Sequence, residues 1–292
     1  MCNKLEGFNL ISNWKPTTFT LPEGILDIKK TFDCGQCFRW NNIGNYTYAG
    51  VIGDKYIQIK QCEAKGGLVE YMTTLDPVYL KDFLNYLGIN DDYSYLEHIN
   101  LTNFEVKAMD KGRGIRILHQ DLWETIVSFI ISQRNNIPKI KTSIQRLCEA
   151  AGTKMVTKNP VTGSEIYYYT FPTPKQIVNL GITGLQNCGL GYRAEYIYTI
   201  ALEFGINPLR FYDYSNKSKS GQETVDFLMR FRGIGPKVAN CIALFGYNKL
   251  DMFPIDIWIS RAIDQYYNGD IDIERFGKLA GLMQQYIFYY MK

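Results

Sequence analysis

The chain has 292 residues, 46% of them hydrophobic, and its 32 basic and 29 acidic side chains give a formal net charge of +3. This length is sufficient to bury a large core in one or two domains. A charge so close to balance excludes a uniformly basic surface, so any nucleic-acid contact must use a local patch. No apolar run approaches the length of a membrane span and no secretory leader is recognised. We therefore expect an intracellular protein with no membrane partner.

Strand patterns occupy the first quarter of the chain. They cover residues 37–40, 46–52, 55–61 and 67–72, with turn-forming residues between them, as at 41–45. From Pro77 onward the apolar period becomes helical, apart from a small hairpin near residues 154–168. The pattern predicts an α+β fold, with an antiparallel sheet-bearing domain over residues 1–115 and a mainly helical domain over residues 116–292.

The cysteines are seven in number and scattered, which is typical of reduced thiols. Cys34 and Cys37 have C-x-x-C spacing, but no second pair or nearby histidine accompanies them. His98 and His119 lie far apart in the sequence and make no ligand set. We expect no disulfide framework, no metal centre and no cofactor.

An apolar helix is predicted over residues 121–133, and a polar turn follows it. The turn contains Arg134 and Asn135, and Lys139 comes shortly after. Such a cluster suits a nucleic-acid backbone or an unpaired base, although a solvated loop explains it equally well.

A second glycine-rich turn, over residues 189–194, places Tyr192 beside Arg193 at the start of a helix. An aromatic ring next to a guanidinium can wedge into a base stack and hold the strand left behind. The simpler interpretation is an ordinary surface pair.

Two short amphipathic helices flank Gly233 and Gly235 within residues 223–245, which predicts a helix-hairpin-helix. The glycines permit a tight turn, and the N–H groups that open the second helix, with Val238 among them, form an anion site. A nucleic-acid phosphate is the expected anion. A glycine-rich turn between two core helices remains the alternative.

Lys237 lies just inside the second helix of this hairpin, and Asp256 opens the next helix. A lysine amine placed there can act as a nucleophile or can make one more phosphate contact. Asp256 can be an ordinary N-cap, a catalytic carboxylate, or both.

These motifs resemble a known family. The segment Gly-Ile-Gly-Pro-Lys-Val-Ala, followed about twenty residues later by Pro-Ile-Asp, is similar to the signature of base-excision DNA glycosylases with a helix-hairpin-helix and a Gly/Pro-rich loop followed by Asp. Residues 35–40, Gly-Gln-Cys-Phe-Arg-Trp, resemble the Gly-Gln-Ser-Phe-Arg-Trp segment of 8-oxoguanine DNA glycosylases. The resemblance extends over most of the chain.

The resemblance implies roles for single residues. Lys237 would attack the sugar, and Asp256 would stabilise the charge that develops on it. The carbonyl of Gly35 would accept the N7 hydrogen that 8-oxoguanine has and guanine lacks. Cys241 would stack on the lesion as a thiolate beside the Lys237 ammonium. Gln284 and Phe288 would complete the lesion pocket.

The family implies further DNA contacts through Gly233, Gly235, Val238 and the Tyr192–Arg193 pair. Trp258 departs from the family, which often has His at this position, so its phosphate contact is in doubt because indole offers one neutral donor.

The residues that face the opposite strand also depart from the family. Where relatives similar to the vertebrate enzyme have an Asn and an Arg that hold cytosine, this chain has Arg134 and Lys139, and only Arg193 is retained. We therefore expect a weakened preference for cytosine opposite the lesion.

The expected protein is a monomeric DNA glycosylase with lyase activity that acts in base excision repair on duplex DNA containing 8-oxoguanine. Its location would be the cytoplasm, with the nucleoid, in a prokaryote and the nucleus in a eukaryote. Two alternatives stay open: a helix-hairpin-helix module that binds DNA without catalysis, and a glycosylase for another damaged base.

Overall fold

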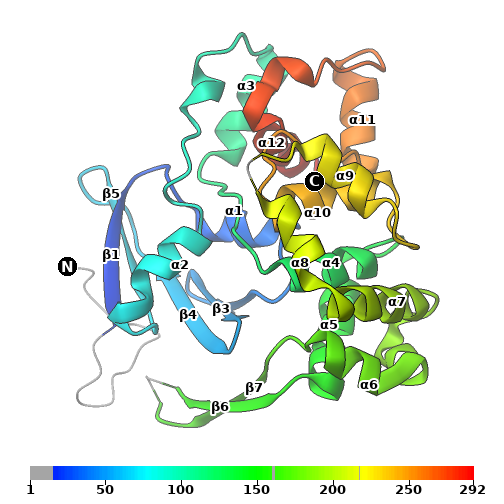
Figure 1. The fold of residues 1–292 in the computed structure, drawn as a ribbon. Coiled ribbons are helices and arrows are strands. Elements are labelled where there is room, and N and C mark those ends of the chain that lie inside the picture. The colour runs from blue at the N-terminus through cyan, green and yellow to red at the C-terminus, as the bar shows by residue number, and fades with distance from the viewer. Residues whose placement is uncertain (1–15, 160–161, 217) are drawn as a thin grey trace.

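The computed structural model describes residues 16–159, 162–216 and 218–292. A five-stranded antiparallel sheet comes first and lies to the left in Figure 1, and the helices gather to its right. Its strands are β1 (Thr17–Pro22), β2 (Asn41–Gly44), β3 (Thr47–Ile52), β4 (Lys55–Gln61) and β5 (Leu68–Thr73), in the order β1-β5-β4-β3-β2. The predicted strands at 46–52, 55–61 and 67–72 are confirmed within one residue as β3, β4 and β5.

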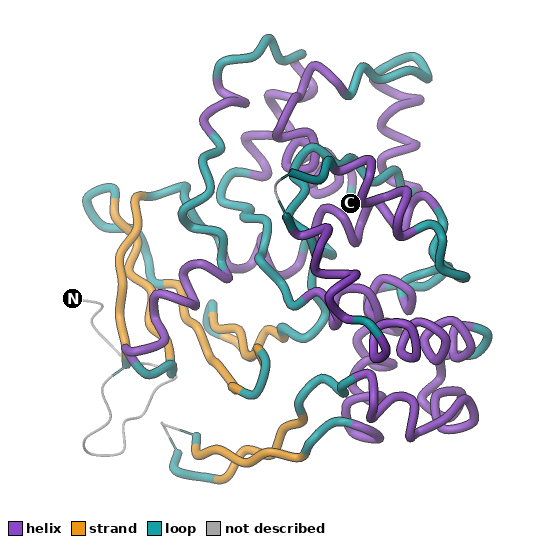
Figure 2. The backbone as a smooth tube through the Cα atoms, viewed as in Figure 1, coloured by secondary structure: helices purple, strands orange, loops and turns teal. Residues whose placement is uncertain are grey.

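Helices make up most of the remainder, so the predicted α+β class is confirmed. They are α1 (Ile28–Asp33), α2 (Leu80–Tyr86), α3 (Asn103–Gly112), α4 (Leu122–Ile131), α5 (Ile137–Ala151), α6 (Pro174–Leu185), α7 (Arg193–Ile206), α8 (Pro208–Tyr212), α9 (Gly221–Leu228), α10 (Pro236–Gly246), α11 (Ile257–Tyr266) and α12 (Ala280–Met291). The predicted hairpin is also found, as β6 (Lys154–Lys158) and β7 (Glu165–Tyr169). Figure 2 shows this hairpin apart from the larger sheet, and the Tyr168 hydroxyl donates to the carbonyl of Asp54 at 2.7 Å.

The strand predicted over residues 37–40 is wrong, and part of the predicted turn at 41–45 is strand β2. Neighbouring side chains of this segment enter different cores, because Cys37 and Trp40 join the cluster behind the sheet while Phe38 joins the helical cluster. The Trp40 carbonyl accepts from Lys141 Nζ at 2.5 Å instead of from a strand partner. Residues 37–40 therefore form an irregular link between the two cores. The alternation of apolar and polar residues in the sequence does not distinguish such a link from a strand.

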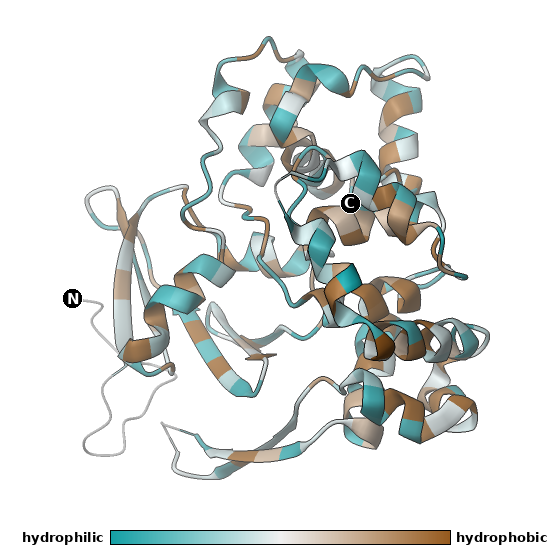
Figure 3. Cartoon of the chain, viewed as in Figure 1, coloured by the Kyte–Doolittle hydropathy of each residue, from teal (hydrophilic) through white to brown (hydrophobic). Residues whose placement is uncertain are grey.

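Two hydrophobic clusters hold the molecule together. The smaller lies at the sheet and includes Tyr48, Ile59 and Tyr71, and the larger fills the helical part. Brown apolar residues alternate with polar ones along the helices, as expected when one face of each helix is buried (Figure 3). Phe104 of α3 belongs to the larger cluster, and α3 packs against α12. The domain boundary near residue 115 stays a prediction.

Six cysteines are free and buried, and Cys2 lies outside the described residues. Within the described ranges, no group of three or more His, Cys, Asp or Glu side chains could hold a metal ion. No described helix is both long and apolar enough to cross a membrane.

The contact between α3 and α12 generates a stability prediction. A Cβ added at Gly112 would overlap the Tyr286 ring and approach the Tyr286 Cα to 3.2 Å. We expect Gly112→Ala to lower the free energy of unfolding by about 1–3 kcal/mol, since overpacking forces backbone shifts. Urea unfolding measures the loss. Gly205→Ala is the matched control, because its new Cβ would lie 3.6 Å from Pro174. Equal free energies of unfolding for the two variants would show that the α3–α12 contact accommodates the added methyl group without loss of stability.

Candidate active site

The predicted helix-hairpin-helix is formed by α9 and α10. Gly233 has φ +89°, and a Cβ at this position would overlap the ring of Tyr196. Gly235 is the N-cap of α10 and faces open space, and Pro236 follows it. The main-chain N–H of Val238 lies in the first turn, where no intrahelical carbonyl is available. Because the Val238 side chain is buried, the predicted DNA contact of this residue would have to use the N–H.

Lys237 extends from the first turn of α10 to the protein surface. Its Nζ lies 5.8 Å from the centre of the Phe129 ring of α4. Phe129 also makes an edge contact with Phe38, with ring centres 5.7 Å apart. A single ring therefore joins the hairpin lysine to the segment that carries Gly35.

Cys241 lies one turn beyond Lys237 and is buried. Burial raises the pKa of the Cys241 thiol, and the nearby Lys237 ammonium opposes this rise only in part, while the charge of Asp256 adds to it. Charges on both predicted catalytic residues thus act on one sulfur. In the DNA-free protein burial therefore works against the thiolate that the resemblance implies, and that thiolate stays a prediction.

Asp256 is the N-cap of α11. Its Oδ1 accepts from the N–H groups of Trp258 and Ile259, each at 2.9 Å. Oδ2 accepts no hydrogen bond from any described residue. One carboxylate oxygen therefore fixes the side chain, and the other is not engaged by the described part of the protein.

Gly35 and Phe288 lie together although they come from opposite ends of the chain. Gly35 has φ +82°, and a Cβ built there would lie 3.6 Å from the Phe288 ring and 3.6 Å from Ile137. Gln284 is buried one turn earlier on α12. The same helix reaches α10 at Gly281, where a Cβ would overlap the Leu244 side chain. The helix that carries Gln284 and Phe288 thus touches α10 at Gly281, and Gly35 lies beside Phe288.

Gln36 fixes the position of Gly35. Its Nε2 donates to the carbonyls of Thr31 at 3.0 Å and Arg116 at 2.7 Å, and its Oε1 accepts from Leu118 N at 2.9 Å. Its own carbonyl accepts from Gln120. A buried amide with all these bonds holds the loop rigidly.

The polar turn after α4 is tied to the hairpin. Gln133 Nε2 donates to the carbonyl of Gly233 at 2.8 Å. Arg193 donates through Nε to the carbonyl of Gln133 at 3.0 Å. Arg134 is exposed at the tip of the turn with φ +47°, a conformation that Asn adopts more easily than Arg. Lys139 is exposed beyond it, and the Asn135 amide is bound to the carbonyl of Ile131.

Tyr192 is half exposed beside this turn. The Arg193 guanidinium lies 4.6 Å from its ring centre, and Tyr196 contacts it edge-on at 5.8 Å. Trp258 is partly buried in the first turn of α11, with the Arg261 guanidinium 5.0 Å from its ring centre. The structure therefore brings the turn after α4 and the Tyr192–Arg193 pair to the hairpin, through Gln133 and Tyr196.

Sequence reasoning did not identify Gln36, Phe129 or Gln133 as parts of the site. Gln36 and Gln133 lie inside the two motifs at residues 35–40 and 132–136, but nothing in the sequence shows that their amides face the protein. Phe129 is one of several apolar residues on its helix, and periodicity gives no sign of its special place.

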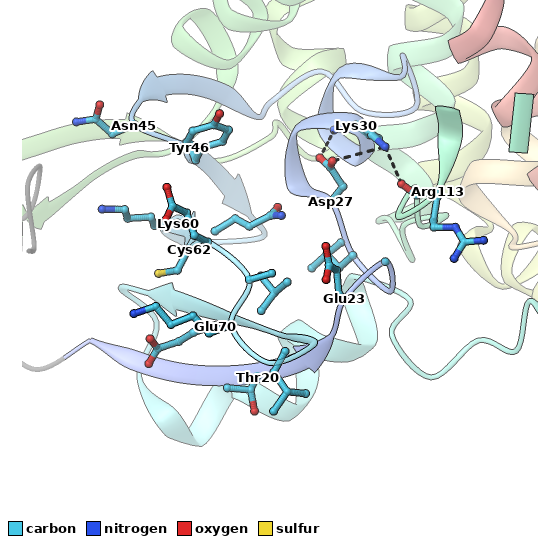
Figure 4. A pocket seen from close by; sticks show the side chains of 18 of the residues that line it. Thr20, Glu23, Asp27, Lys30, Asn45, Tyr46, Lys60, Cys62, Glu70 and Arg113 are labelled. Carbon is cyan, nitrogen blue, oxygen red and sulfur yellow. Dashed lines mark hydrogen bonds and ion pairs between the residues drawn. The ribbon is translucent and has the colours of Figure 1, made fainter. Parts of the chain in front are cut away.

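A separate cavity of about 1100 Å³ lies in the sheet-bearing part of the molecule (Figure 4). Asp27, Lys30 and Arg113 line it, and Lys30 Nζ donates to the Arg113 carbonyl at 3.0 Å. None of the predicted site residues lines it, so cavity size does not indicate the chemistry here.

Comparison with known proteins agrees with this geometry. The model of the 8-oxoguanine DNA glycosylase N-terminal domain matches residues 18–126, and that of the HhH-GPD superfamily of base excision DNA repair proteins matches residues 127–275. The N-glycosylase/DNA lyase of Saccharomyces cerevisiae is 28% identical, over 83% of this chain and 68% of its own length.

Solved structures are similar over almost the whole chain. The 8-oxoguanine glycosylase/lyase of Clostridium acetobutylicum, solved with double-stranded DNA containing cytosine opposite 8-oxoguanine, is 32% identical with a TM-score of 0.81, and 97% of each chain is covered. Among relatives compared by sequence, the Arabidopsis thaliana N-glycosylase/DNA lyase is 27% identical over 94% of this chain and 79% of its own length. The chain belongs to the 8-oxoguanine DNA glycosylase family of the HhH-GPD base excision repair superfamily.

Proposed function

We propose that this protein excises 8-oxoguanine from duplex DNA and then cleaves the strand, with Lys237 as the nucleophile and Asp256 as the stabilising carboxylate. The observation that carries this assignment is the convergence of Lys237, Cys241 and Asp256 at the edge of the hairpin. A module that only bound phosphate would need the hairpin amides, but it would not need a carboxylate with one oxygen unbonded.

The lesion must first leave the base stack, at a cost of a few kcal/mol that phosphate contacts at the hairpin and insertion of Tyr192 would offset. The amine of Lys237 then attacks C1′ as the bond from C1′ to the base breaks. Asp256 Oδ2 faces the positive charge that develops on the sugar. Opening of the sugar ring gives an imine on Lys237, and β-elimination expels the 3′ phosphate.

The lesion is assigned through the wall formed by Gly35 and Phe288. The Gly35 carbonyl is a hydrogen-bond acceptor, so it would favour a purine that carries a hydrogen on N7. Guanine presents a lone pair there and would be rejected. A pocket for an oxidised pyrimidine or an alkylated purine has no need of this acceptor.

We further propose that the protein acts as a monomer, in the compartment that holds the DNA: with the nucleoid in a prokaryote, or in the nucleus of a eukaryote. The sheet-bearing part, assigned to residues 1–115, would supply the Gly35 wall. The helical part, assigned to residues 116–292, would supply the nucleophile and the strand contacts.

The nucleophile is tested by Lys237→Gln. We expect no borohydride-trapped adduct with an 8-oxoguanine duplex, because Gln cannot form an imine. Duplex affinity should stay within about tenfold, since a single phosphate contact is worth about 1–2 kcal/mol. Lys175→Gln, at an exposed position of α6, is the control and should trap normally. Trapping that persists in Lys237→Gln would reject this nucleophile.

The lesion contact of Cys241 is tested by Cys241→Lys, which places a second amine beside Lys237. We expect weak binding of the lesion duplex and a loss of about tenfold or more in the ratio of single-turnover rates for 8-oxoguanine and guanine, since a second ammonium beside Lys237 is repelled by it. Cys241→Ala separates charge from the loss of sulfur and should keep most of the ratio. An unchanged ratio in Cys241→Lys would mean that Cys241 does not touch the base.

Opposite-base selection is tested with four duplexes that differ only in the base facing 8-oxoguanine. Arg134 offers donors only, and Arg193 is bound to the carbonyl of Gln133. Because each good bidentate base contact discriminates by about 1–3 kcal/mol, we expect a cytosine preference of roughly tenfold or less in single-turnover excision. Arg134→Asn should increase it. A hundredfold preference in the unmodified protein would refute this account.

A further inference from the structure

A second cavity, of about 400 Å³, borders Gly35. We call it the lysine cavity, because four lysines from separate parts of the chain line it: Lys29 of α1, Lys111 of α3, Lys141 of α5, and Lys292, which follows α12. Neither Lys237 nor Asp256 lines it, and Gly35 is the one predicted site residue in its described lining.

The lysine cavity is strongly positive for a protein of net charge +3. Asp33 is the one acidic residue among its lining side chains in the described part of the chain. Asp33 is already paired, because Lys29 Nζ lies 3.0 Å from Oδ2 and the Tyr48 hydroxyl donates to the same oxygen at 2.7 Å. No second acidic side chain lines the cavity in the described part of the chain to balance the other three ammonium groups. A hollow lined by charge of one sign concentrates counter-ions.

Main-chain carbonyls hold three of these ammonium groups at the cavity. Lys111 Nζ donates to the carbonyl of Tyr290 at 3.2 Å, and Lys292 Nζ donates to the carbonyl of Asp33 at 3.3 Å. Lys141 Nζ donates to the carbonyl of Trp40. An ammonium has three donors, and Lys141 Nζ uses a second one on Asn41 Oδ1 at 3.5 Å, so each group keeps at least one N–H bond for a ligand. The carbonyls reduce the freedom that these side chains would lose on binding.

We propose that the lysine cavity is a binding site for a phosphate-bearing anion of the size of pyrophosphate or the phosphate tail of a nucleotide. Its volume is within the range of small-ligand sites, and lysine binds phosphate as a point charge without demanding a planar partner. The anion has two possible sources, a free nucleotide or diphosphate and the backbone of DNA.

Binding would affect the lesion wall. The anion would link α1, α3, α5 and the end of α12, and Lys292 Nζ already lies 5.8 Å from the Phe288 ring centre. Gly35 forms part of the same cavity lining. The anion therefore fixes both sides of the wall that faces the damaged base, and it raises the stability of the DNA-free protein.

The test is thermal unfolding of the DNA-free protein titrated with inorganic pyrophosphate at constant ionic strength. We expect a saturable rise in Tm of roughly 3–8 °C at high excess. Because the hairpin is also an anion site, the decisive comparison is between two double variants. Lys111→Gln/Lys292→Gln should weaken apparent pyrophosphate affinity about tenfold or more, since two charge contacts are lost. Lys81→Gln/Lys175→Gln, which removes the same charge from exposed positions outside the cavity, should leave it unchanged.

Lys111→Arg/Lys292→Arg keeps both positive charges and should keep the pyrophosphate affinity. This variant shows whether a loss of affinity in the glutamine variant comes from lost charge or from misfolding. Adding an undamaged duplex distinguishes the sources. Displacement of pyrophosphate by the duplex, followed by phosphorus NMR, assigns the site to DNA backbone phosphate, and simultaneous binding assigns it to a free anion. Equal pyrophosphate affinity in the unmodified protein and Lys111→Gln/Lys292→Gln, or no saturable shift at all, would overturn the proposal.

Discussion

The arrangement of the site depends on one short path of hydrogen bonds through Gln133. Its amide donates to the carbonyl of Gly233, and its own carbonyl accepts from Arg193. The turn after α4, the start of α7 and the hairpin are therefore fixed relative to one another. Tyr196 closes the path by packing where Gly233 has no side chain. Any larger residue at Gly233 would force the hairpin away from the turn after α4.

A separate set of hydrogen bonds, made by Gln36, holds the wall formed by Gly35 and Phe288. Gln36 is buried and connects its loop to the segment around Arg116 and Leu118, so Gly35 keeps its position beside Phe288. The site thus combines two rigid halves, one built by the sheet-bearing part and one by the hairpin. Phe129 lies between them, because it contacts both Phe38 and Lys237. Under the proposed function, this division explains how an exposed lysine would be positioned on the lesion without a deep pocket around it.

Much of the candidate site can be predicted from the sequence, because the hairpin and its neighbouring residues depend on local spacing. The hairpin follows from two glycines between amphipathic helices, and the shared face of Lys237 and Cys241 follows from a separation of four residues. The approach of Gly35 to Phe288 joins opposite ends of the chain, and no local period encodes it. The orientation of Arg193 was equally hidden, since a guanidinium beside an exposed tyrosine looks the same whether it faces DNA or a carbonyl. The state of the Cys241 thiol depends on burial, which only the fold reveals.

The central claim is that one particular amine forms the covalent intermediate. The most direct measurement is mass spectrometry of the unmodified protein after borohydride trapping on an 8-oxoguanine duplex, with nuclease and protease digestion to locate the added sugar. The account predicts that the reduced sugar is attached to the peptide containing Lys237 and to no other site. Attachment to a different lysine or to the amino terminus would contradict it, whatever the activity of the enzyme.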